Sequence, residues 1–446
     1  MKILVPNLIE GEEVEGVSEL PVHEPSRNQV AHVLQLADVA TVDKAVRAAE
    51  QAFKTFGKAP AHLRSKILHA VAKRILEERE SFADLMVASS GKTRRDALGE
   101  VERSAETMAI CAEEALRIEG FEVPMDSSPR GEGRIAIARR FPVGVVAAIT
   151  PFNAPLNTVC HKIGPAFAAG NTVVLKPDVR GARVALKLAG LFAEAGLLAG
   201  ALSVVHGDAE AGEALVTHAL VDIVGFTGSE ATGERIIRIA GLKKVLLELG
   251  GNAPVIVHND ADVDKAVAAI APAAFGMSGQ SCISVQRVYV HKDIHDAFLA
   301  KLKAKAEAFR IGPPEAPETD IGPMVTEAAA QRVEGAVQAA AAAGATIVCG
   351  GKRDGAYMPP TILGNVSLDM VAVGCEIFGP VVSVIPYATI DEAIEQANAT
   401  PYGLQTGVFT NSLELTRRAA TELRFGGILM NNASRWRLDH MPYGGV

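Results

Sequence analysis

The sequence contains few of the residues that would cross-link it or hold a metal. Five cysteines occur in 446 residues, and no two of them form a Cys-x-x-Cys pair. This spacing excludes a zinc ribbon and a dithiol redox motif, and the odd number leaves at least one thiol unpaired. A long chain with few cysteines is typical of a reducing compartment, so we expect a cytoplasmic protein. The histidines also lack ligand spacing, so no metal site is predicted.

Clustered positive charge and long apolar runs are missing as well. Lys and Arg number 44 against 52 Asp and Glu, and no run of basic residues exceeds two. This balance argues against a nucleic-acid partner. No apolar run reaches the roughly 18 residues of a membrane span, and residues 1–10 lack the basic and apolar regions of a signal peptide. The hydrophobic content of 48% indicates a folded chain, and the length predicts two or three domains.

The periodicity of the apolar residues changes along the chain. Helical spacing predicts helices over residues 41–56, 63–86 and 95–117. Residues 134–140 read Arg-Ile-Ala-Ile-Ala-Arg-Arg, which predicts a half-buried strand that exposes charge on one face, in an arm that pairs outside the main domain. From residue 143, short apolar strands alternate with helices, which is typical of a parallel sheet covered on both faces.

Neither a G-x-G-x-x-G fingerprint nor a phosphate-binding P-loop occurs. Polar residues instead follow the predicted strands, at the sheet edge where ligands bind in such folds. Thr150 ends one strand, and Asn153 lies between two prolines that fix the backbone around it. A rigid amide suits the stabilisation of an oxyanion, although Asn153 could equally cap the next helix.

Two further strand ends carry candidate ligand contacts. Lys176 follows the run Val-Val-Leu and points either at a ligand or at solvent. Gly228 and Ser229 follow another strand and open a helix, whose N–H groups and dipole favour a phosphate. An ordinary turn with Ser229 as the helix cap is the alternative.

A carboxylate and a thiol lie further along the chain. Glu248 stands among leucines before a glycine pair, and burial there would raise its pKa and suit it to general-base work. The alternative is a strand-end carboxylate turned to solvent. Cys282 follows Gly-Gln-Ser, small neighbours that let a substrate approach, although a lone cysteine is usually inert.

Together these segments resemble the NAD(P)-dependent aldehyde dehydrogenase superfamily. The segments Leu-Glu-Leu-Gly-Gly-Asn around Glu248 and Gly-Gln-Ser-Cys ending at Cys282 are similar to its two signature regions. The later segments Cys-Glu-Ile-Phe-Gly-Pro (375–380) and Met-Pro-Tyr-Gly-Gly (441–445) resemble its Glu-x-Phe-Gly-Pro loop and its Pro-Phe-Gly-Gly turn. The resemblance covers nearly the whole chain.

The resemblance implies a mechanism. Cys282 would attack an aldehyde and form a thiohemiacetal, with Asn153 holding the oxyanion. Hydride transfer to NAD or NADP would leave a thioester, which water activated by Glu248 would hydrolyse to the carboxylic acid. The implied cofactor-binding residues are Thr150, Lys176, Gly228, Ser229, Glu376 and Phe378. A coenzyme A-acylating dehydrogenase is the alternative, which the presence of Glu248 disfavours, and a catalytically silent scaffold is a second one.

Departures from the family pattern bear on cofactor and substrate. Where many NAD-preferring members carry Glu, this chain has Val179 followed by Arg180, which makes NADP use plausible, whereas Asp178 opposes it. Several segments, among them the Ser-Val-Gln-Arg run (284–287) after Cys282, look like the lactaldehyde, phosphonoacetaldehyde and benzaldehyde dehydrogenase branch. Arg435 and Arg437 would grip an anionic aldehyde, or else form ordinary surface or interface salt bridges.

The resemblance also implies an α/β, two-domain aldehyde dehydrogenase-like fold. We expect a Rossmann-like nucleotide-binding domain (1–120 and 143–250), a β oligomerisation arm (121–142), an α/β catalytic domain (251–430) and a return segment (431–446). A homodimer or homotetramer is expected. We also expect that the C-terminal tail with which relatives build their oligomer is absent after Val446.

Overall fold

The computed structural model describes residues 3–445, so the expectation about the end of the chain at Val446 lies outside the described residues. Within them the chain forms two compact units. The first unit comprises residues 3–22, 32–82 and 98–247. The second unit comprises residues 23–31, 83–97 and 248–445. The domain boundaries that the sequence suggested stay a prediction; in the structure, 23–31 and 83–97 belong with the second unit.

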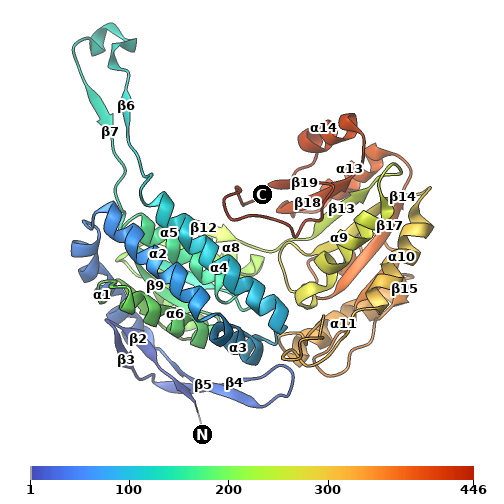
Figure 1. The fold of residues 1–446 in the computed structure, drawn as a ribbon, viewed down its shortest axis with the longest axis horizontal. Coiled ribbons are helices and arrows are strands. Elements are labelled where there is room, and N and C mark those ends of the chain that lie inside the picture. Colours follow the sequence, from blue (N-terminus) through green and yellow to red (C-terminus); the bar gives the residue numbers. More distant parts are fainter. Residues whose placement is uncertain (1–2, 446) are drawn as a thin grey trace. The chain divides into compact units, whose positions relative to one another are not determined.

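The main sheet of the first unit has seven strands in the order β12-β11-β8-β9-β10-β2-β3. Figure 1 labels β12, β9, β2 and β3 of this sheet. Its central strands β8, β9, β10 and β11 are parallel, as the alternation of strands and helices predicted. The strands are β2 (Asn7–Ile9), β3 (Glu12–Val14), β8 (Val145–Thr150), β9 (Thr172–Pro177), β10 (Leu202–Val204), β11 (Val221–Thr227) and β12 (Lys244–Glu248). The helices packed around them are α1 (Val39–Phe56), α5 (Asn157–Ala168), α6 (Ala182–Glu194), α7 (Ala209–Thr217) and α8 (Glu230–Ile239).

The N-terminal region differs from its prediction in two ways. Besides helices it contains a small sheet of β1 (Leu4–Val5), β5 (Val30–Leu36) and β4 (Ser18–His23). β1 has only two residues, β4 is mostly exposed, and the buried residues of β5 are consecutive, so none of these strands shows the apolar alternation that identifies a half-buried strand. The single helix expected over 63–86 is two helices, because α2 (Ala61–Glu77) ends before α3 (Arg79–Ser90) begins. The next helix, α4 (Arg94–Glu114), matches its prediction closely.

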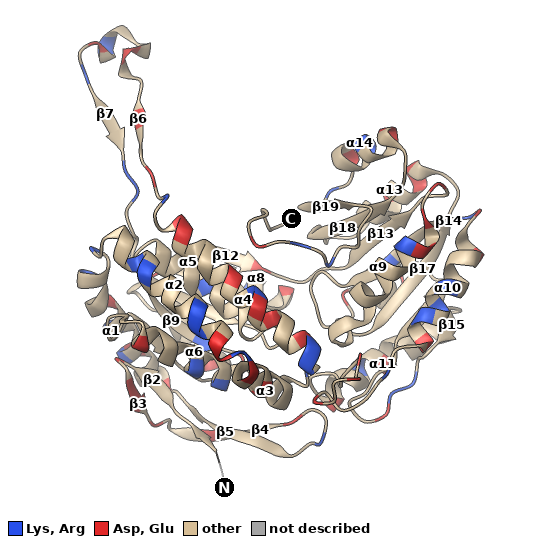
Figure 2. Ribbon diagram, viewed as in Figure 1, with Lys and Arg blue, Asp and Glu red and all other residues tan. Residues whose placement is uncertain are grey.

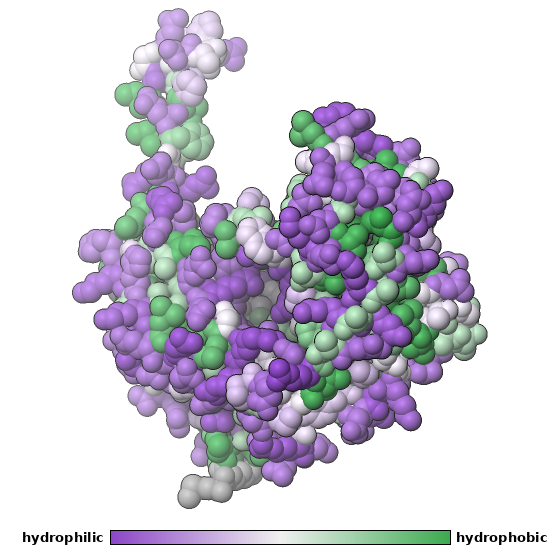
Figure 3. Space-filling view, turned by 45° about the vertical axis from the view of Figure 1, so that its right-hand side comes forward, coloured by the Kyte–Doolittle hydropathy of each residue, from purple (hydrophilic) through white to green (hydrophobic). Residues whose placement is uncertain are grey.

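The predicted arm is a hairpin of β6 (Phe121–Val123) and β7 (Ala136–Ala138), which pair antiparallel. The strand expected over 134–140 is therefore confirmed, although it is shorter. Large apolar side chains lie exposed on the hairpin, including Phe121 at 63% and Ile137 at 69%. Figure 3 shows hydrophobic residues along its strands. The hairpin thus presents apolar surface that its own few residues do not cover.

The second unit is built on a second seven-stranded sheet, in the order β15-β16-β17-β14-β13-β18-β19. Its strands are β13 (Ala253–Val257), β14 (Val285–His291), β15 (Thr346–Cys349), β16 (Thr361–Gly364), β17 (Val381–Tyr387), β18 (Gln405–Phe409) and β19 (Gly427–Met430). Its helices are α9 (Val263–Phe275), α10 (His295–Glu307), α11 (Glu327–Ala342), α12 (Val371–Gly374), α13 (Ile390–Asn398) and α14 (Leu413–Glu422).

Both faces of this sheet are buried. Val255 and Val257 of β13 pack in one cluster with α9 and α10, whereas Ile256 between them packs in another cluster with α13 and α14. Successive side chains of a strand point to opposite faces, so apolar residues are needed on both faces of this sheet. Figure 2 shows the consequence, with charges on helices such as α10 and α14 and mostly uncharged strands.

Between residues 3 and 445, no helix combines the length and the hydropathy that a membrane span requires.

Candidate active site

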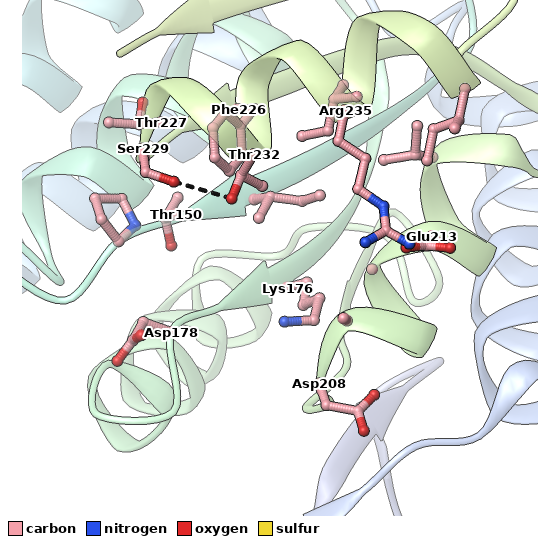
Figure 4. A pocket seen from close by; sticks show the side chains of 18 of the residues that line it. Thr150, Lys176, Asp178, Asp208, Glu213, Phe226, Thr227, Ser229, Thr232 and Arg235 are labelled. Carbon is pink, nitrogen blue, oxygen red and sulfur yellow. Dashed lines mark hydrogen bonds and ion pairs between the residues drawn. The ribbon is translucent and has the colours of Figure 1, made fainter. Parts of the chain in front are cut away.

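The first unit contains a pocket of about 450 Å³ at the carboxyl ends of β8, β9 and β11. Its wall includes Thr150, Lys176, Gly228 and Ser229, four of the residues that the sequence singled out (Figure 4). Apolar side chains such as Ile236 of α8 complete the lining. The structure therefore gathers strand ends that are far apart in the sequence around one cavity, as expected for a parallel sheet.

Lys176 is half-buried in this pocket, which excludes the alternative of a solvent-exposed lysine. Burial lowers the pKa of its ammonium group, while the carboxylates of Asp178 and Asp208 act to raise it. The Lys176 ammonium group can donate hydrogen bonds to hydroxyl groups of a ligand in the pocket.

The start of α8 forms another wall of the pocket. Ser229 occupies the N-cap position, but its side chain makes no capping bond. Its hydroxyl instead lies 2.9 Å from that of Thr232 (Figure 4). Gly228, Ser229 and Thr232 line the pocket, so the start of α8, with its first-turn N–H groups and the positive end of its dipole, lies at the pocket wall. On the same helix, Arg235 pairs with Glu213 of α7.

Asn153 lies in the loop between β8 and α5. The N-cap position of α5 is Leu156, so the alternative that Asn153 caps this helix is wrong. The carboxylate of Glu100, which is buried on α4, binds the N–H groups of Leu156 and Asn157 at 2.8 and 3.0 Å. A residue far away in the sequence thus anchors the end of the Asn153 loop.

The pocket has the chemistry that a nicotinamide dinucleotide requires. Lys176 offers a donor for ribose hydroxyls, the start of α8 offers N–H groups for a pyrophosphate, and the apolar wall offers contact for an adenine ring. Asp178 also lines the pocket and lies 3.5 Å from the guanidinium of Arg180. Arg180 and Asp178, which the sequence weighed against each other, thus form one ion pair.

Cys282 lies in the second unit, in the turn that follows α9. The turn is tightly coiled, since Met277 and Ser278 both adopt left-handed backbone conformations with φ of 54°. The Ser278 hydroxyl donates to the carbonyl of Gly322 at 2.7 Å, which fixes this conformation. A left-handed backbone is costly for side chains other than glycine, and it persists only where the surroundings determine it.

The Cys282 thiol has a hydroxyl and two carboxylates around it. Its sulfur lies 3.2 Å from the hydroxyl oxygen of Tyr443. Burial raises the pKa of the Cys282 thiol, the hydrogen bond with Tyr443 lowers it, and the charges of Glu376 and Glu248 raise it. Glu248 is half-buried, so its side chain does not simply extend into solvent as the alternative supposed. The thiol predicted as nucleophile and the carboxylate predicted as base therefore interact electrostatically.

The residues after Cys282 hold two loops against it. Gln286 is the second residue of β14. Its side chain donates to the carbonyl of Gly251 at 2.8 Å and accepts from the N–H of Ile377 at 3.0 Å. Gly251 touches the Cys282 backbone so closely that a Cβ on it would lie 2.1 Å from the Cys282 carbonyl oxygen. Only glycine fits this position. Gln286 therefore links the glycine loop after Glu248 with the loop that carries Glu376.

Glu376 and Phe378 are both in this second loop. The Glu376 carboxylate accepts a hydrogen bond of 2.9 Å from the N–H of Gly251. Phe378 is held in a left-handed conformation with φ of 50°. The two residues that the resemblance assigned to the nicotinamide side of the cofactor thus lie in one constrained loop that touches the glycine loop.

Arg287, directly after Gln286, is the largest fully buried side chain described. Its guanidinium donates to the Asn252 side chain at 3.0 Å and to the Asn252 carbonyl at 3.0 Å. It also donates to the carbonyl of Gln396 at 3.0 Å and to the hydroxyl of Tyr289 at 2.9 Å. Asn252 in turn donates to the carbonyls of Val373 and Cys375. Neutral acceptors therefore satisfy the buried cation. Arg287 binds the glycine loop after Glu248 directly, and Asn252 connects it to the loop that carries Glu376.

The two arginines predicted to grip an anion lie in different surroundings. The Arg435 guanidinium donates to the carbonyl of Pro272 in the last turn of α9, at 3.1 Å. The Arg437 guanidinium is nearly buried and lies 3.5 Å from the carboxylate of Asp439. Its carbon sits 4.1 Å from the centre of the Tyr443 ring. A role of either arginine in substrate binding stays a prediction.

Several residues of the site escaped the sequence reasoning. Tyr443 was treated only as part of a turn, yet a tyrosine where the family has phenylalanine adds a hydroxyl and was a usable signal. Gln286 and Arg287 were noted only as a mark of a family branch. Glu100 gave no signal, because its partners are backbone groups more than fifty residues away in the sequence. In residues 3–445, no group of three or more His, Cys, Asp or Glu side chains is arranged to hold a metal.

Comparison with known proteins agrees with this geometry. Residues 13–446 match the aldehyde dehydrogenase family. The chain is 48% identical over 440 residues to a 3-sulfolactaldehyde dehydrogenase of Priestia aryabhattai, covering 98% of this chain and 92% of that protein. It is 36% identical to an NADP-dependent glyceraldehyde-3-phosphate dehydrogenase of Streptococcus equinus, covering 99% of this chain and 93% of that one. The crystal structure of aldehyde dehydrogenase 21 from Physcomitrella patens, in complex with the reaction product succinate, superposes with a TM-score of 0.97 at 35% identity, covering 100% of this chain and 93% of that one.

The chain therefore belongs to the aldehyde dehydrogenase family and has its fold. It is an oxidoreductase that acts on aldehydes. The predicted class of fold and of enzyme is confirmed.

The Arg287 network generates a stability prediction. We expect Arg287→Lys to lower the melting temperature by roughly 2–5 °C, because lysine cannot reproduce the forked hydrogen bonds to Asn252 and leaves buried acceptors unpaired. Differential scanning calorimetry would measure this, with Arg417→Lys on an exposed face of α14 as the matched control. Equal melting temperatures for both variants would contradict the structural role of Arg287.

Proposed function

We propose that this enzyme oxidises an anionic aldehyde to a carboxylic acid, with NAD⁺ or NADP⁺ as hydride acceptor and Cys282 as covalent nucleophile. The observation that carries the proposal is the thiol of Cys282 held beside a hydroxyl and influenced by the charge of Glu248 in one compact unit. A thiol, a nearby base and rigid glycine-lined loops are what acyl chemistry on cysteine requires.

The chemistry at Cys282 begins with loss of its proton. The thiolate sulfur then bonds to the aldehyde carbon, and the π electrons of the carbonyl move to its oxygen, which gives a thiohemiacetal anion. We assign stabilisation of this oxyanion to the side-chain amide of Asn153 and the backbone N–H of Cys282. Bound NAD⁺ or NADP⁺ supplies the acceptor for the hydride that leaves this carbon, and the acyl group remains on sulfur as a thioester.

Glu248 completes the reaction in this proposal. Its carboxylate takes a proton from water, and the water oxygen bonds to the thioester carbon. The carbon–sulfur bond then breaks, which releases the carboxylic acid and returns Cys282 as thiolate. The charge of Glu248 acts on the pKa of the Cys282 thiol, which supports a place for its carboxylate in the same site.

The cofactor residues follow from the pocket of the first unit. Thr150, Lys176, Gly228 and Ser229 line it, and we propose that they hold the adenosine and pyrophosphate parts. Glu376 and Phe378 are proposed for the nicotinamide side. Val179 stands where a glutamate would repel a 2′-phosphate, and Arg180 next to it brings positive charge. Since Arg180 is paired with Asp178, both NAD⁺ and NADP⁺ are proposed as acceptors.

An anionic substrate is supported by the names of the relatives. Sulfolactaldehyde carries a sulfonate, glyceraldehyde 3-phosphate carries a phosphate, and succinate carries a second carboxylate. Arg437 lies against Tyr443, which itself contacts Cys282, so its guanidinium lies in the immediate surroundings of the thiol. A guanidinium binds such anions through two parallel hydrogen bonds. We therefore propose Arg437 as a substrate contact, with Arg435 as the second candidate.

Compartment and assembly complete the proposal. The five cysteines are free thiols, which suits a cytoplasmic enzyme. The β6–β7 hairpin exposes Phe121 and Ile137, and an apolar surface of this kind favours a homodimer or homotetramer.

The first test is formation of reduced cofactor from a panel of anionic and neutral aldehydes, each with NAD⁺ and NADP⁺. We expect turnover of the anionic aldehydes that Cys282→Ala abolishes, because no other residue is proposed to form the thioester. The matched control is Cys375→Ala, which removes an exposed thiol and leaves Cys282 intact. Full turnover by Cys282→Ala would refute the covalent mechanism.

Glu248→Gln tests hydrolytic release. We expect a first-turnover burst of reduced cofactor of normal size, followed by steady-state turnover lowered by about 10²–10⁴-fold, because the base acts only in deacylation. Stopped-flow absorbance at the wavelength of the reduced nicotinamide separates the two phases. A rate increase of the unmodified enzyme on addition of coenzyme A would instead favour the acyl-transferring alternative.

The arginines are tested by pairing an anionic aldehyde with a neutral analogue, such as sulfolactaldehyde with lactaldehyde. We expect Arg437→Ala to raise KM for the anionic member about tenfold or more while changing KM for the neutral one little, since only the former loses a charged hydrogen bond. The same measurement on Arg435→Ala distinguishes the two candidates. Unchanged KM ratios in both variants would remove the arginines from the proposal.

A further inference from the structure

Tyr443 contacts the sulfur of Cys282, the proposed nucleophile. The roles proposed for Cys282, Glu248 and Asn153 do not account for this contact. Its hydroxyl oxygen lies 3.2 Å from the Cys282 sulfur, which is hydrogen-bonding distance for a sulfur acceptor. We propose that the Tyr443 hydroxyl donates a hydrogen bond to the Cys282 thiolate and is thereby a catalytic residue of aldehyde oxidation. The inference rests on the proposed role of Cys282 as nucleophile.

The surroundings of the thiol create the need for such a donor. Burial and the charges of Glu376 and Glu248 all disfavour a thiolate and raise the pKa of Cys282. The hydrogen bond from Tyr443 acts in the opposite direction. The carboxylates of Glu376 and Glu248 both act on the thiol. The neutral Tyr443 hydroxyl can stabilise the thiolate without neutralising Glu248, the base that deacylation requires.

The same surroundings keep the proton on Tyr443. Burial raises the pKa of its phenol well above the usual value, and the nearby charges of Cys282 and Glu248 raise it further. Tyr443 is therefore a donor at every physiological pH and cannot accept the thiol proton. That proton leaves to water or to Glu248, and the Tyr443 O–H bond stays intact throughout.

Arg437 supports Tyr443 from the face of its ring. The guanidinium carbon lies 4.1 Å from the ring centre, and its positive charge acts to lower the pKa of the phenol. A phenol polarised in this way is a stronger hydrogen-bond donor. Asp439, 3.5 Å from Arg437, orients the guanidinium. In this arrangement Tyr443 is the catalytic group, and Arg437 and Asp439 are positioning residues for it.

The backbone holds Tyr443 tightly from its other side. A Cβ on Gly445 would lie 2.5 Å from the carbonyl oxygen of Gly403, and one on Gly426 would lie 1.5 Å from the carbonyl oxygen of Gly444. The segment after Tyr443 therefore packs backbone against backbone. Earlier in the same segment, the Ser434 hydroxyl donates to the carbonyl of Ile283, next to Cys282, at 2.8 Å. The hydroxyl of Tyr443 is thus placed by contacts on both sides of it.

The hydrogen bond has opposite effects on the amount of thiolate and on its reactivity. Loss of a charge-assisted hydrogen bond should raise the thiol pKa by about one unit, which lowers the thiolate fraction about tenfold at pH 7. The thiolate that remains is more nucleophilic by roughly threefold, because nucleophilicity rises with basicity with a slope of about 0.4–0.5. The net change is a loss of about threefold at pH 7 and a gain of about threefold where the thiol is fully ionised.

The test is alkylation of Cys282 by iodoacetamide as a function of pH, without aldehyde or cofactor, followed by mass spectrometry of the peptide that contains Cys282. We expect Tyr443→Phe to shift the apparent thiol pKa upward by about one unit and to give a rate profile that crosses that of the unmodified enzyme. Tyr357→Phe, which removes a hydroxyl elsewhere in the second unit, should leave the profile unchanged. Arg437→Gln should shift it upward by less than Tyr443→Phe does.

The outcomes separate the possible explanations. A Tyr443→Phe profile identical to that of the unmodified enzyme would overturn the proposal, and so would a rate lowered by the same factor at every pH, which would indicate a packing defect. Alkylation does not depend on turnover, so it would still report on the hydrogen bond if Cys282→Ala retained activity and the covalent mechanism failed.

Discussion

The site in the second unit depends on the hydrogen bonds of two adjacent residues in one strand. Gln286 and Arg287 stand in β14, a few residues after Cys282, and their side chains bind the backbones or side chains of both neighbouring loops. Buried polar groups are costly unless every one finds a partner. Here the need to satisfy a buried guanidinium and a buried amide fixes the loops after Glu248 and around Glu376. The positions of the loops around Cys282 thus follow from the pairing of buried polar groups in the core.

The first unit solves a similar problem with a different residue. The loop that carries Asn153 must leave β8 and enter α5, and this leaves N–H groups at the start of the helix without intrahelical partners. Glu100 supplies the acceptor from α4. In both units the loop with a candidate catalytic or binding group is held by a charged side chain that plays no part in the proposed chemistry. Burial of such a charge is tolerated because it binds several partners at once.

The sequence was sufficient for features that repeat locally or match a known pattern. The alternation of apolar strands and helices after residue 143 predicted the parallel sheet, because the period of side chains is a local property. The strand ends at Thr150, Lys176 and Ser229 predicted a common pocket, since parallel strands end at one edge. The strands before residue 37 were missed because β1, β2 and β3 have only two or three residues, β4 is mostly exposed, and the buried residues of β5 are consecutive, so no local period marks them. Tyr443, Glu100 and Arg287 were missed because their roles come from contacts with residues far away in the chain, which no local window contains.

The distribution of the candidate groups over two compact units has an evolutionary consequence. The pocket residues Thr150, Lys176 and Ser229 belong to the first unit, whereas Cys282, Glu248 and Arg437 belong to the second. If the pocket of the first unit holds the cofactor as proposed, a substitution near Val179 changes the affinity for one nucleotide over the other without altering the hydrogen bonds around the thiol. If Arg437 binds the aldehyde as proposed, a substitution in the segment after residue 430 changes the aldehyde that is accepted and leaves the nucleotide pocket as it is. Descendants of one ancestral gene can therefore diversify in electron acceptor and in substrate along two separate mutational routes.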